Sequence, residues 1–287
     1  MKMAANFLTQ ALPFVTSLEE CASYGTVVEP FIPQFQLLPS RFLQIWNSPH
    51  QLVELYLATN PLVTAIWLSL ILAPLFLVAA EVTRNYSQVD RFWSILPTTY
   101  NAHYFLWALY SGLPMQRLNS LLAISTAWSI RLTFNYWRRG GYQYGSEDYR
   151  WEQLRKVIPA PLFFVLDVLF IAVAQSLLLM SITMPTYILL VSTTLVGNEL
   201  RWPDLVAPWL LMGLVLTSFF ADQQQWEFHE AKLQYKKSAR PSGGYSVEQI
   251  ERGFNSKDLF AFVRHPSFIA EQSKKHILKH RRNHASF

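Results

Sequence analysis

The sequence has few charged residues. Charged side chains make up only 15% of its 287 residues, whereas hydrophobic residues make up 51% and aromatic residues 15%. Soluble domains average about 25% charged residues, so this deficit argues against a fold surrounded by water. The length fits one membrane domain with an extramembrane portion, and we expect a membrane-embedded protein.

Cysteine is almost absent, and so are several recognition signals. Cys21 is the only cysteine, which excludes an intrachain disulfide and a thiolate metal cluster. The net charge is +5, but no nucleic-acid-binding motif accompanies it, and basic residues of membrane proteins usually flank their spans. We therefore expect no nucleic-acid partner, and nothing indicates an obligate protein partner. The first twenty residues show no convincing cleavage site, so we expect no removable signal peptide.

Long uncharged runs predict membrane-spanning helices, because a helix crosses the hydrocarbon core with about 20 residues. No charge lies between Leu55 and Ala80, and the clearest span is expected at 62–80. Further spans are expected near 94–116, near 118–135, twice within 157–198 with a hinge at Met184-Pro185, and at 205–221. The sequence therefore predicts an all-α, polytopic transmembrane helical bundle of about six spans, followed by a polar C-terminal segment.

The two ends of the chain differ in composition from this membrane domain, which we place at 55–272. Residues 1–54 are predicted to be irregular because prolines break long helices; these are Pro13, Pro30, Pro33 and Pro39. Residues 273–287 form a tail with five Lys or Arg and three His. The histidines, four residues apart, could share a helical face as metal ligands: His276, His280 and His284. Since no carboxylate or cysteine supports them, we favour a solvated basic tail and predict no metal site.

Three segments are too rich in charged and aromatic residues to be ordinary connectors. The first is VDRFWS at 89–94, which fits either an interfacial aromatic belt or the lining of a site. The second is RLTFNYWRRGGYQYGSEDYRW at 131–151, where a turn at Gly140 and Gly141 can bring Tyr142, Glu147 and Asp148 back toward the membrane. Such a cluster could donate a proton and orient a carbonyl, or it could be a salt-bridged interfacial loop.

The third segment consists of 221–234 and 253–272. Asp222, Gln225 and His229 recur at helical spacing, so one helix face can present them together. In Arg264-His265-Pro266, the proline fixes a turn and the two adjacent cations could bind a phosphate or diphosphate.

At these residues the chain resembles the steroid 5-alpha-reductase-like family of membrane oxidoreductases, in its fungal and bacterial branch. Similar motifs in that branch read VDRxWS, RLTxNxWRxGGYxxGxEDYRW, ADxQxWxF and GLFxxSRHPNxxxEQ, and the matches run in order over about residues 85–272. The resemblance implies a helical membrane fold with NADPH as cofactor. It further implies reduction of an activated carbon–carbon double bond in a lipid-like small molecule, in an integral multi-pass protein of the endoplasmic reticulum membrane.

The resemblance also implies roles for individual residues. Asp222, Gln225, Arg264, His265, Ser267 and Glu271 fall on positions that hold the nucleotide. Trp128 stands where related steroid reductases have a catalytic Tyr, so that acid does not transfer, and Arg131 matches a basic position just beyond it. As candidates for activating the substrate carbonyl we take Arg131, Tyr142 and Glu147.

Two departures separate this chain from the family pattern. Ser267 stands where the family has Asn, and the basic tail stands where the family continues with a Trp-rich span and one more. We therefore expect the family's C-terminal spans to be missing, which could impair activity. Two alternatives stay open beside the reductase: a non-catalytic membrane protein of the same fold, and a membrane methyltransferase that uses S-adenosylmethionine.

Overall fold

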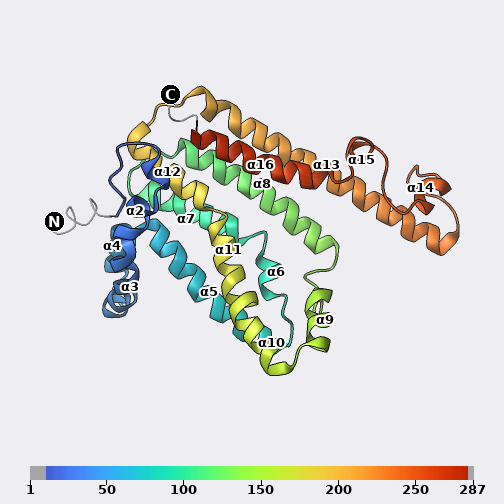
Figure 1. The fold of residues 1–287 in the computed structure, drawn as a ribbon, viewed down its shortest axis with the longest axis horizontal. Helices are drawn as coiled ribbons and strands as arrows, with labels where there is room; N and C mark the ends of the chain where they lie inside the picture. The colour runs from blue at the N-terminus through green and yellow to red at the C-terminus, as the bar shows by residue number, and fades with distance from the viewer. Residues whose placement is uncertain (1–10, 284–287) are drawn as a thin grey trace. The chain divides into compact units, whose positions relative to one another are not determined.

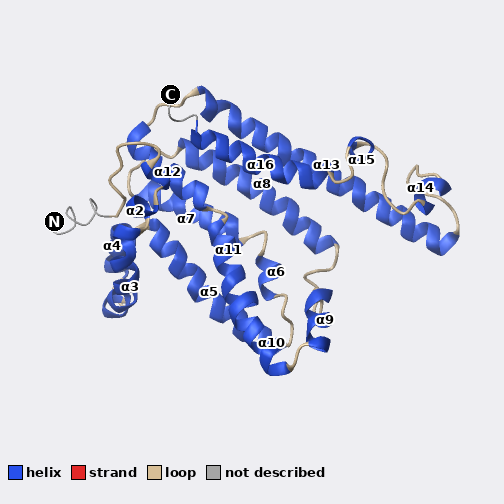
Figure 2. Ribbon diagram, in the orientation of Figure 1, coloured by secondary structure: helices blue, strands red, loops and turns tan. Residues whose placement is uncertain are grey.

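The computed structural model describes residues 11–283, with side chains up to Lys274, and this part of the chain is helical without any strand (Figure 2). It divides into two compact units, one up to Leu200 (unit 1) and one from Arg201 (unit 2). The helices of unit 1 are α2 Tyr24–Val27, α3 Ile32–Ile45, α4 Pro49–Ala58, α5 Pro61–Thr83, α6 Gln88–Phe92, α7 Leu96–Tyr110, α8 Gln116–Arg138, α9 Tyr149–Val157, α10 Ala160–Leu166, α11 Gln175–Ser181 and α12 Met184–Val196, with short 3₁₀ turns at Glu20–Ala22 and Glu29–Phe31. A π-helix over Asp167–Ala174 joins α10 to α11. The helices of unit 2 are α13 Trp202–Ser238, α14 Val247–Glu251, α15 Leu259–Phe262 and α16 Pro266–Asn283.

Local sequence defines both ends of α5. The Asn60 side chain accepts a hydrogen bond from the Leu62 backbone N–H at 2.8 Å, and Pro61 occupies the first turn, where a missing N–H costs nothing. Arg84 ends the helix in a left-handed conformation at φ 53°. The 23 residues between them carry a single charge, Glu81 in the last turn. The predicted span at 62–80 thus lies within a single helix that is long and apolar enough to cross a membrane.

Three helical stretches of the described residues are long and apolar enough to cross a membrane: Pro61–Thr83, Ala160–Val196 and Trp202–Ser238. Six spans are not confirmed. Helix α7 has only 15 residues, fewer than the roughly 20 that a crossing needs. Helix α8 has 23 residues but carries Arg117, Arg131 and Arg138. The predicted hinge falls close to its expected place, since a break at Ile182 and Thr183 precedes α12, which begins at Met184 with Pro185 in its first turn.

The N-terminal part is more helical than its prolines predicted, because α3 continues through Pro39. Proline has no N–H, so Pro39 cannot donate to the carbonyl of Phe35 four residues earlier. That carbonyl instead accepts a hydrogen bond from the indole N–H of Trp67 on α5 at 2.9 Å, and the Phe35 and Trp67 rings stack at 5.1 Å. A side chain of a neighbouring helix thus replaces the bond that the proline removes.

The core of unit 1 lies where α5, α7 and α12 meet (Figure 1). Tyr104 on α7 and Tyr187 on α12 are both fully buried, and their ring centroids are 5.9 Å apart. The amide of Asn60 donates to the Tyr187 hydroxyl at 3.0 Å, and Thr186 donates to the Asn101 side chain at 2.7 Å. These buried bonds fix the helix ends relative to one another, which gives unit 1 a rigid frame.

Unit 2 is built on α13 and α16, which lie side by side and run in opposite directions (Figure 1). The end of α13 packs against the segment that follows it through a small cluster containing Phe228, Tyr245 and Ile250. The chain turns at Gly243 and Gly244, whose φ values of 64° and 71° favour glycine. The chain therefore folds back along α13 before α16 begins.

Candidate functional site

A polar loop of unit 1 between α8 and α9 is fastened to the segment that follows α5. Several hydrogen bonds join this segment to the loop and to the start of α9, among them Asn85 Nδ2 to Ser146 O at 2.8 Å, Tyr86 N to Glu147 Oε1 at 2.8 Å, Asp148 N to Ser87 Oγ at 2.8 Å, and Trp151 Nε1 to Asp90 Oδ2 at 2.8 Å. This loop belongs to one of the three polar segments that the sequence singled out, and the 84–91 segment overlaps another. The structure therefore brings the first two predicted segments together.

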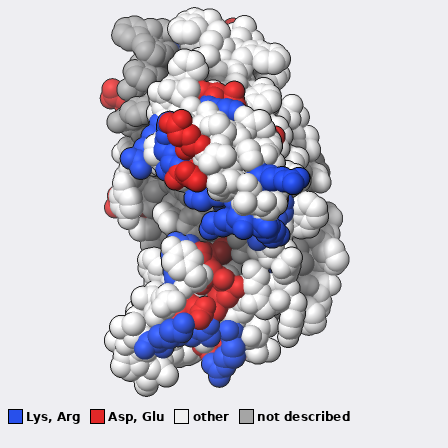
Figure 3. Space-filling model, turned by 90° about the vertical axis from the view of Figure 1, so that its right-hand side faces the viewer, with Lys and Arg blue, Asp and Glu red and all other residues white. Residues whose placement is uncertain are grey.

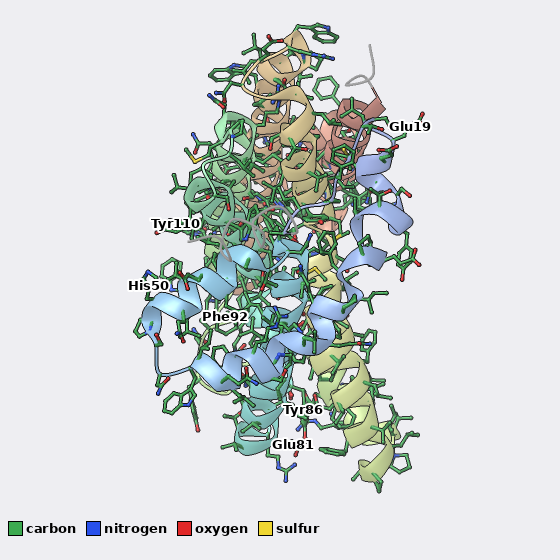
Figure 4. All side chains as sticks on the ribbon, turned by 90° about the vertical axis from the view of Figure 1, so that its left-hand side faces the viewer. Glu19, His50, Glu81, Tyr86, Phe92 and Tyr110 are labelled. Atoms are coloured by element: carbon green, nitrogen blue, oxygen red, sulfur yellow. The ribbon has the colours of Figure 1, made fainter. Side chains whose placement is uncertain are left out.

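Glu147 is the centre of this attachment. One carboxylate oxygen accepts the Tyr86 N–H, and the other pairs with the guanidinium of Arg155 on α9. Arg155 also lies 5.0 Å from the centre of the Tyr86 ring. The Tyr86 hydroxyl donates to Glu81 at 3.3 Å, and Figure 4 shows these two residues close together beside the end of α5. Because its carboxylate is 13% exposed and both its oxygens are engaged, Glu147 holds the loop in place.

The other two predicted catalytic residues, Tyr142 and Arg131, also lie in unit 1. The Tyr142 hydroxyl donates to the Arg91 backbone carbonyl at 2.9 Å, and its ring meets the Tyr136 ring edge-on at 4.9 Å. Arg131 lies on α8 with 6% of its surface exposed. None of the three predicted residues lines the cavity described next, although their sequence neighbours Leu132 and Asp148 do. Their catalytic roles stay predictions.

Unit 1 contains a cavity of about 730 Å³ beside the polar loop. Its wall combines one face of α8, the start of the loop, α9 and the helix that runs through the π-helix into α11. The lining residues are Asp90, Trp93, Ser94, Leu132, Asn135, Tyr136, Arg139, Asp148, Arg150, Trp151, Phe170, Ala174, Gln175 and Leu178. Cavities of roughly 300–1,000 Å³ with a few convergent polar groups are typical of small-molecule sites. The cavity is our candidate ligand site.

Two of the charged residues that line this cavity form an ion pair. Arg150 donates to both oxygens of Asp148 at 2.8 Å, and this hydrogen bonding holds the pKa of Asp148 below its ordinary value. Further along α9, Lys156 and Glu152 pair at 2.7 Å. Figure 3 shows basic and acidic side chains intermixed on the face that it draws.

The sequence missed the contribution of Gln175 and of the helix face that carries it. Gln175 lies within 157–198, where two spans were predicted, and nothing in that prediction marked it as the wall of a cavity. Asn135 and Tyr136 lay inside a segment that was singled out, but their position in that segment gave no sign that they line a cavity. Polar residues within an otherwise apolar span are the signal that could have found Gln175.

In unit 2, the structure brings the two predicted nucleotide-binding segments into contact. The Ser267 hydroxyl at the start of α16 donates to Asp222 Oδ1 on α13 at 2.9 Å. Gln224 on α13 accepts the Leu259 N–H at 3.2 Å through its side chain, and its backbone carbonyl accepts from Asn255 at 3.4 Å. Segments more than thirty residues apart are thus joined at the predicted positions.

The remaining predicted nucleotide-binding residues differ in exposure and in their partners. The Gln225 amide N–H₂ donates to His229 Nε2 at 3.0 Å, while the Gln225 Oε1 atom is buried without a hydrogen-bond partner among residues 11–283. Glu271 pairs with Lys274 at 3.0 Å. Arg264 and His265 are exposed, and the Arg264 guanidinium lies 5.9 Å from the Phe254 ring.

The histidines of the tail give no metal site that can be described. His276 and His280 lie on α16 beyond the described side chains, and His284 lies outside the described residues. Within the described part of the chain, no group of three or more His, Cys, Asp or Glu could hold a metal ion.

Comparison with known proteins gives two matches. The family described as "Protein of unknown function (DUF1295)" matches residues 75–274, which is more than half of the chain. An uncharacterised protein of Schizosaccharomyces pombe is 36% identical over 269 residues, which cover 92% of this chain and 76% of the relative. No solved structure matches the chain. The matched range includes the polar loop, the cavity and the Asp222–Ser267 contact, and the chain belongs to the family of proteins of unknown function DUF1295.

Proposed function

We propose that the chain is a multi-pass membrane reductase, resident in the endoplasmic reticulum membrane, that uses NADPH to reduce an activated carbon–carbon double bond in a lipid-like or sterol-like substrate. The observation that carries this proposal is the 2.9 Å hydrogen bond between Asp222 and Ser267. It joins the two segments of unit 2 whose motifs resemble the nucleotide-binding segments of steroid 5-alpha-reductase-like enzymes.

The residues of unit 2 fit a nicotinamide nucleotide chemically. The buried Oε1 atom of Gln225 lacks a partner within the described residues, and a buried polar atom of this kind calls for one. A carboxamide N–H₂ is a suitable donor to it. Arg264 and His265 are exposed cations or potential cations, which suits them to phosphate oxygens. Asp222 and Ser267 fix the relative position of the two helices that carry these groups.

In this proposal NADPH supplies a hydride to the substrate. The chain's own residues bind and orient. In unit 2, Arg264 and His265 would hold the phosphates, and Gln225 would orient the amide of the nicotinamide. In unit 1, the C-terminal end of α8 places Tyr136 and Arg139 at the cavity, where donors near a carbonyl oxygen would stabilise developing negative charge. Glu147 and Tyr142 hold that loop, while Arg131 stays a candidate for carbonyl activation.

The test uses the purified full-length chain in lipid nanodiscs. We expect saturable binding of NADPH, measured by its fluorescence, and its consumption when an enone lipid is added. Ser267→Ala removes one hydrogen bond of about 1 kcal/mol, so NADPH binding should weaken by roughly fivefold to tenfold. Ser238→Ala is the matched control, because the exposed Ser238 hydroxyl bonds to nearby backbone at the end of α13, donating to the Gln234 carbonyl at 2.9 Å and accepting from the Arg240 N–H at 3.3 Å.

The same titration is made with S-adenosylmethionine, which separates the reductase from a methyltransferase. Binding of S-adenosylmethionine without binding of NADPH would overturn the proposal. Absence of binding of both nucleotides would favour a non-catalytic membrane protein of this fold.

A further inference from the structure

The wall of the unit 1 cavity contains one buried polar side chain that the protein does not satisfy. Gln175, the first residue of α11, is 8% exposed, and its Oε1 atom has no hydrogen-bond partner in the described part of the chain. Other buried polar groups of this wall are bonded within the protein. Ser94 Oγ lies 2.8 Å from Thr133 Oγ1, and the Trp151 indole N–H donates to Asp90 at 2.8 Å. Because buried polar groups almost always have a partner, Gln175 calls for one from outside the protein.

The surface around Gln175 is apolar along one side. Phe170, Ala174 and Leu178 recur every four residues, so they share one face of the helix and line the cavity in a row. They belong to the stretch Ala160–Val196, which is long and apolar enough to cross a membrane. Trp93 and Leu132 add apolar surface from other elements. A ligand with a hydrocarbon body can bury apolar area here, at about 25 cal/mol per Å².

The charges that line the cavity cancel. Two acidic residues, Asp90 and Asp148, stand against two basic residues, Arg139 and Arg150. Asp148 is already held by both nitrogens of its Arg150 partner. A ligand with a net charge would meet no excess of opposite charge and would still lose its hydration. The lining therefore favours a neutral ligand over an anionic or a cationic one.

We propose that this cavity binds a neutral lipid alcohol, whose hydroxyl group hydrogen-bonds to the side-chain amide of Gln175. A hydroxyl donates a hydrogen bond, which the unpartnered Oε1 atom of Gln175 can accept, whereas an ether oxygen cannot donate one. The volume of about 730 Å³ suits a molecule the size of a sterol or a single-chain alcohol. The binding of the alcohol does not depend on the proposed reductase function. Only the further statement that the bound alcohol is the substrate rests on that function.

The experiment measures binding of a fluorescent sterol alcohol to the full-length protein in nanodiscs, by energy transfer from the protein's tryptophans. Two lining residues, Trp93 and Trp151, are donors at the cavity itself. The same sterol carrying a methoxy group in place of the hydroxyl is the matched ligand. Hexadecanol, added as a competitor, distinguishes a ring lipid from a single-chain lipid that offers the same hydroxyl.

Gln175→Leu keeps the size of the side chain and removes the amide. We expect it to weaken binding of the sterol alcohol about tenfold, as loss of one buried hydrogen bond predicts, and to leave the methoxy sterol unchanged. Gln51→Leu makes the same chemical change at an exposed position of α4 and should leave both unchanged. Ala174→Phe fills the cavity and should weaken both sterols.

Equal weakening of alcohol and ether by Gln175→Leu would overturn the hydrogen bond, and so would no weakening of either. The proposed site would be overturned if the wild-type protein bound neither the sterol nor hexadecanol and Ala174→Phe behaved in the same way. If the alcohol binds as expected but no NADPH is consumed, the reductase proposal fails and the binding site stands.

Discussion

Glu147 offers a sharp test of what the polar loop does, because a catalytic role and a structural role predict different results. Its carboxylate accepts the Tyr86 N–H at 2.8 Å and pairs with Arg155. Tyr86 is 4% exposed, so its N–H has little access to water once the carboxylate is gone. Arg155 would keep only its weaker contacts with the Arg84 carbonyl at 3.3 Å and with the Tyr86 ring.

The size of the effect follows from these two interactions. A hydrogen bond to a charged group contributes about 1.5–3 kcal/mol, and a buried donor left unsatisfied costs about 1–3 kcal/mol. Since the two contacts share one side chain and are not additive, we expect Glu147→Ala to destabilise the loop attachment by about 3 kcal/mol. Glu147→Gln keeps an acceptor for Tyr86 and loses only the charge, so its cost should be about half of that.

Hydrogen–deuterium exchange of the full-length protein measures this attachment directly. A loss of about 3 kcal/mol corresponds to roughly hundredfold faster exchange of the Tyr86 amide. Glu152→Gln is the control, because Glu152 is 56% exposed and its pair with Lys156 joins neighbouring turns of α9. Unchanged protection of Tyr86 in Glu147→Ala would refute the structural role. Lost activity with unchanged protection would instead support the predicted catalytic role.

Three further predictions concern unit 1. Gly141→Ala places a Cβ inside the ring of Tyr136, so the loop must shift, and thermal unfolding should show a loss of stability of about 1–3 kcal/mol. In Gly145→Ala the new Cβ meets no atom within 4 Å, so the loss of stability should come only from backbone strain at a φ of 79° and amount to about 1 kcal/mol. Asp148 has a lowered pKa in the folded protein, so its pairing stabilises the fold above the unfolded pKa of about 4, and this stabilisation is lost as the pH falls through the lower folded pKa. The difference in melting temperature between wild type and Asp148→Asn should therefore be constant near neutral pH and shrink below about pH 4. A difference that grows on acidification would contradict this. Trp67→Phe removes the donor to the Phe35 carbonyl and should lower the free energy of unfolding by about 1 kcal/mol. In a Pro39→Ala background the restored backbone N–H supplies that hydrogen bond, so the loss should be smaller. An equal loss in both backgrounds would show that the indole does not replace the missing backbone bond.

The apolar helices were predictable from the sequence, because the length of an uncharged hydrophobic run is enough to predict such a helix. The uncharged run before Glu81 gave the span of α5, and Met184-Pro185 gave the position of the break before α12 within about two residues. A span was predicted near 118–135, but α8, which covers these residues, carries three arginines and is not confirmed as a span. One of them, Arg117, donates to the Gly197 carbonyl at 2.9 Å, a contact between residues eighty positions apart that local pattern cannot reveal.

Long-range contacts likewise limited what could be predicted of the site. The motifs predicted that 221–234 and 253–272 act together, and the Asp222–Ser267 hydrogen bond brings them together. The motifs did not reveal that Glu147 fastens a loop to the segment after α5, since its partners come from two other elements. Gln175 could not be placed at a cavity, because which face of an apolar helix is covered depends on packing that periodicity does not specify.

The most direct test of the proposed reductase traces the hydrogen that NADPH would transfer to the lipid. The full-length protein in nanodiscs is incubated with NADPH carrying deuterium at the transferable position and with an enone lipid, and the lipid product is analysed by mass spectrometry. The proposal predicts a saturated product that has gained one deuterium from the nucleotide and one proton from solvent. Ser238→Ala should give the same product, and Ser267→Ala should give it more slowly at limiting nucleotide. A lipid recovered without deuterium, from protein that is folded by its exchange protection, would contradict the proposed function.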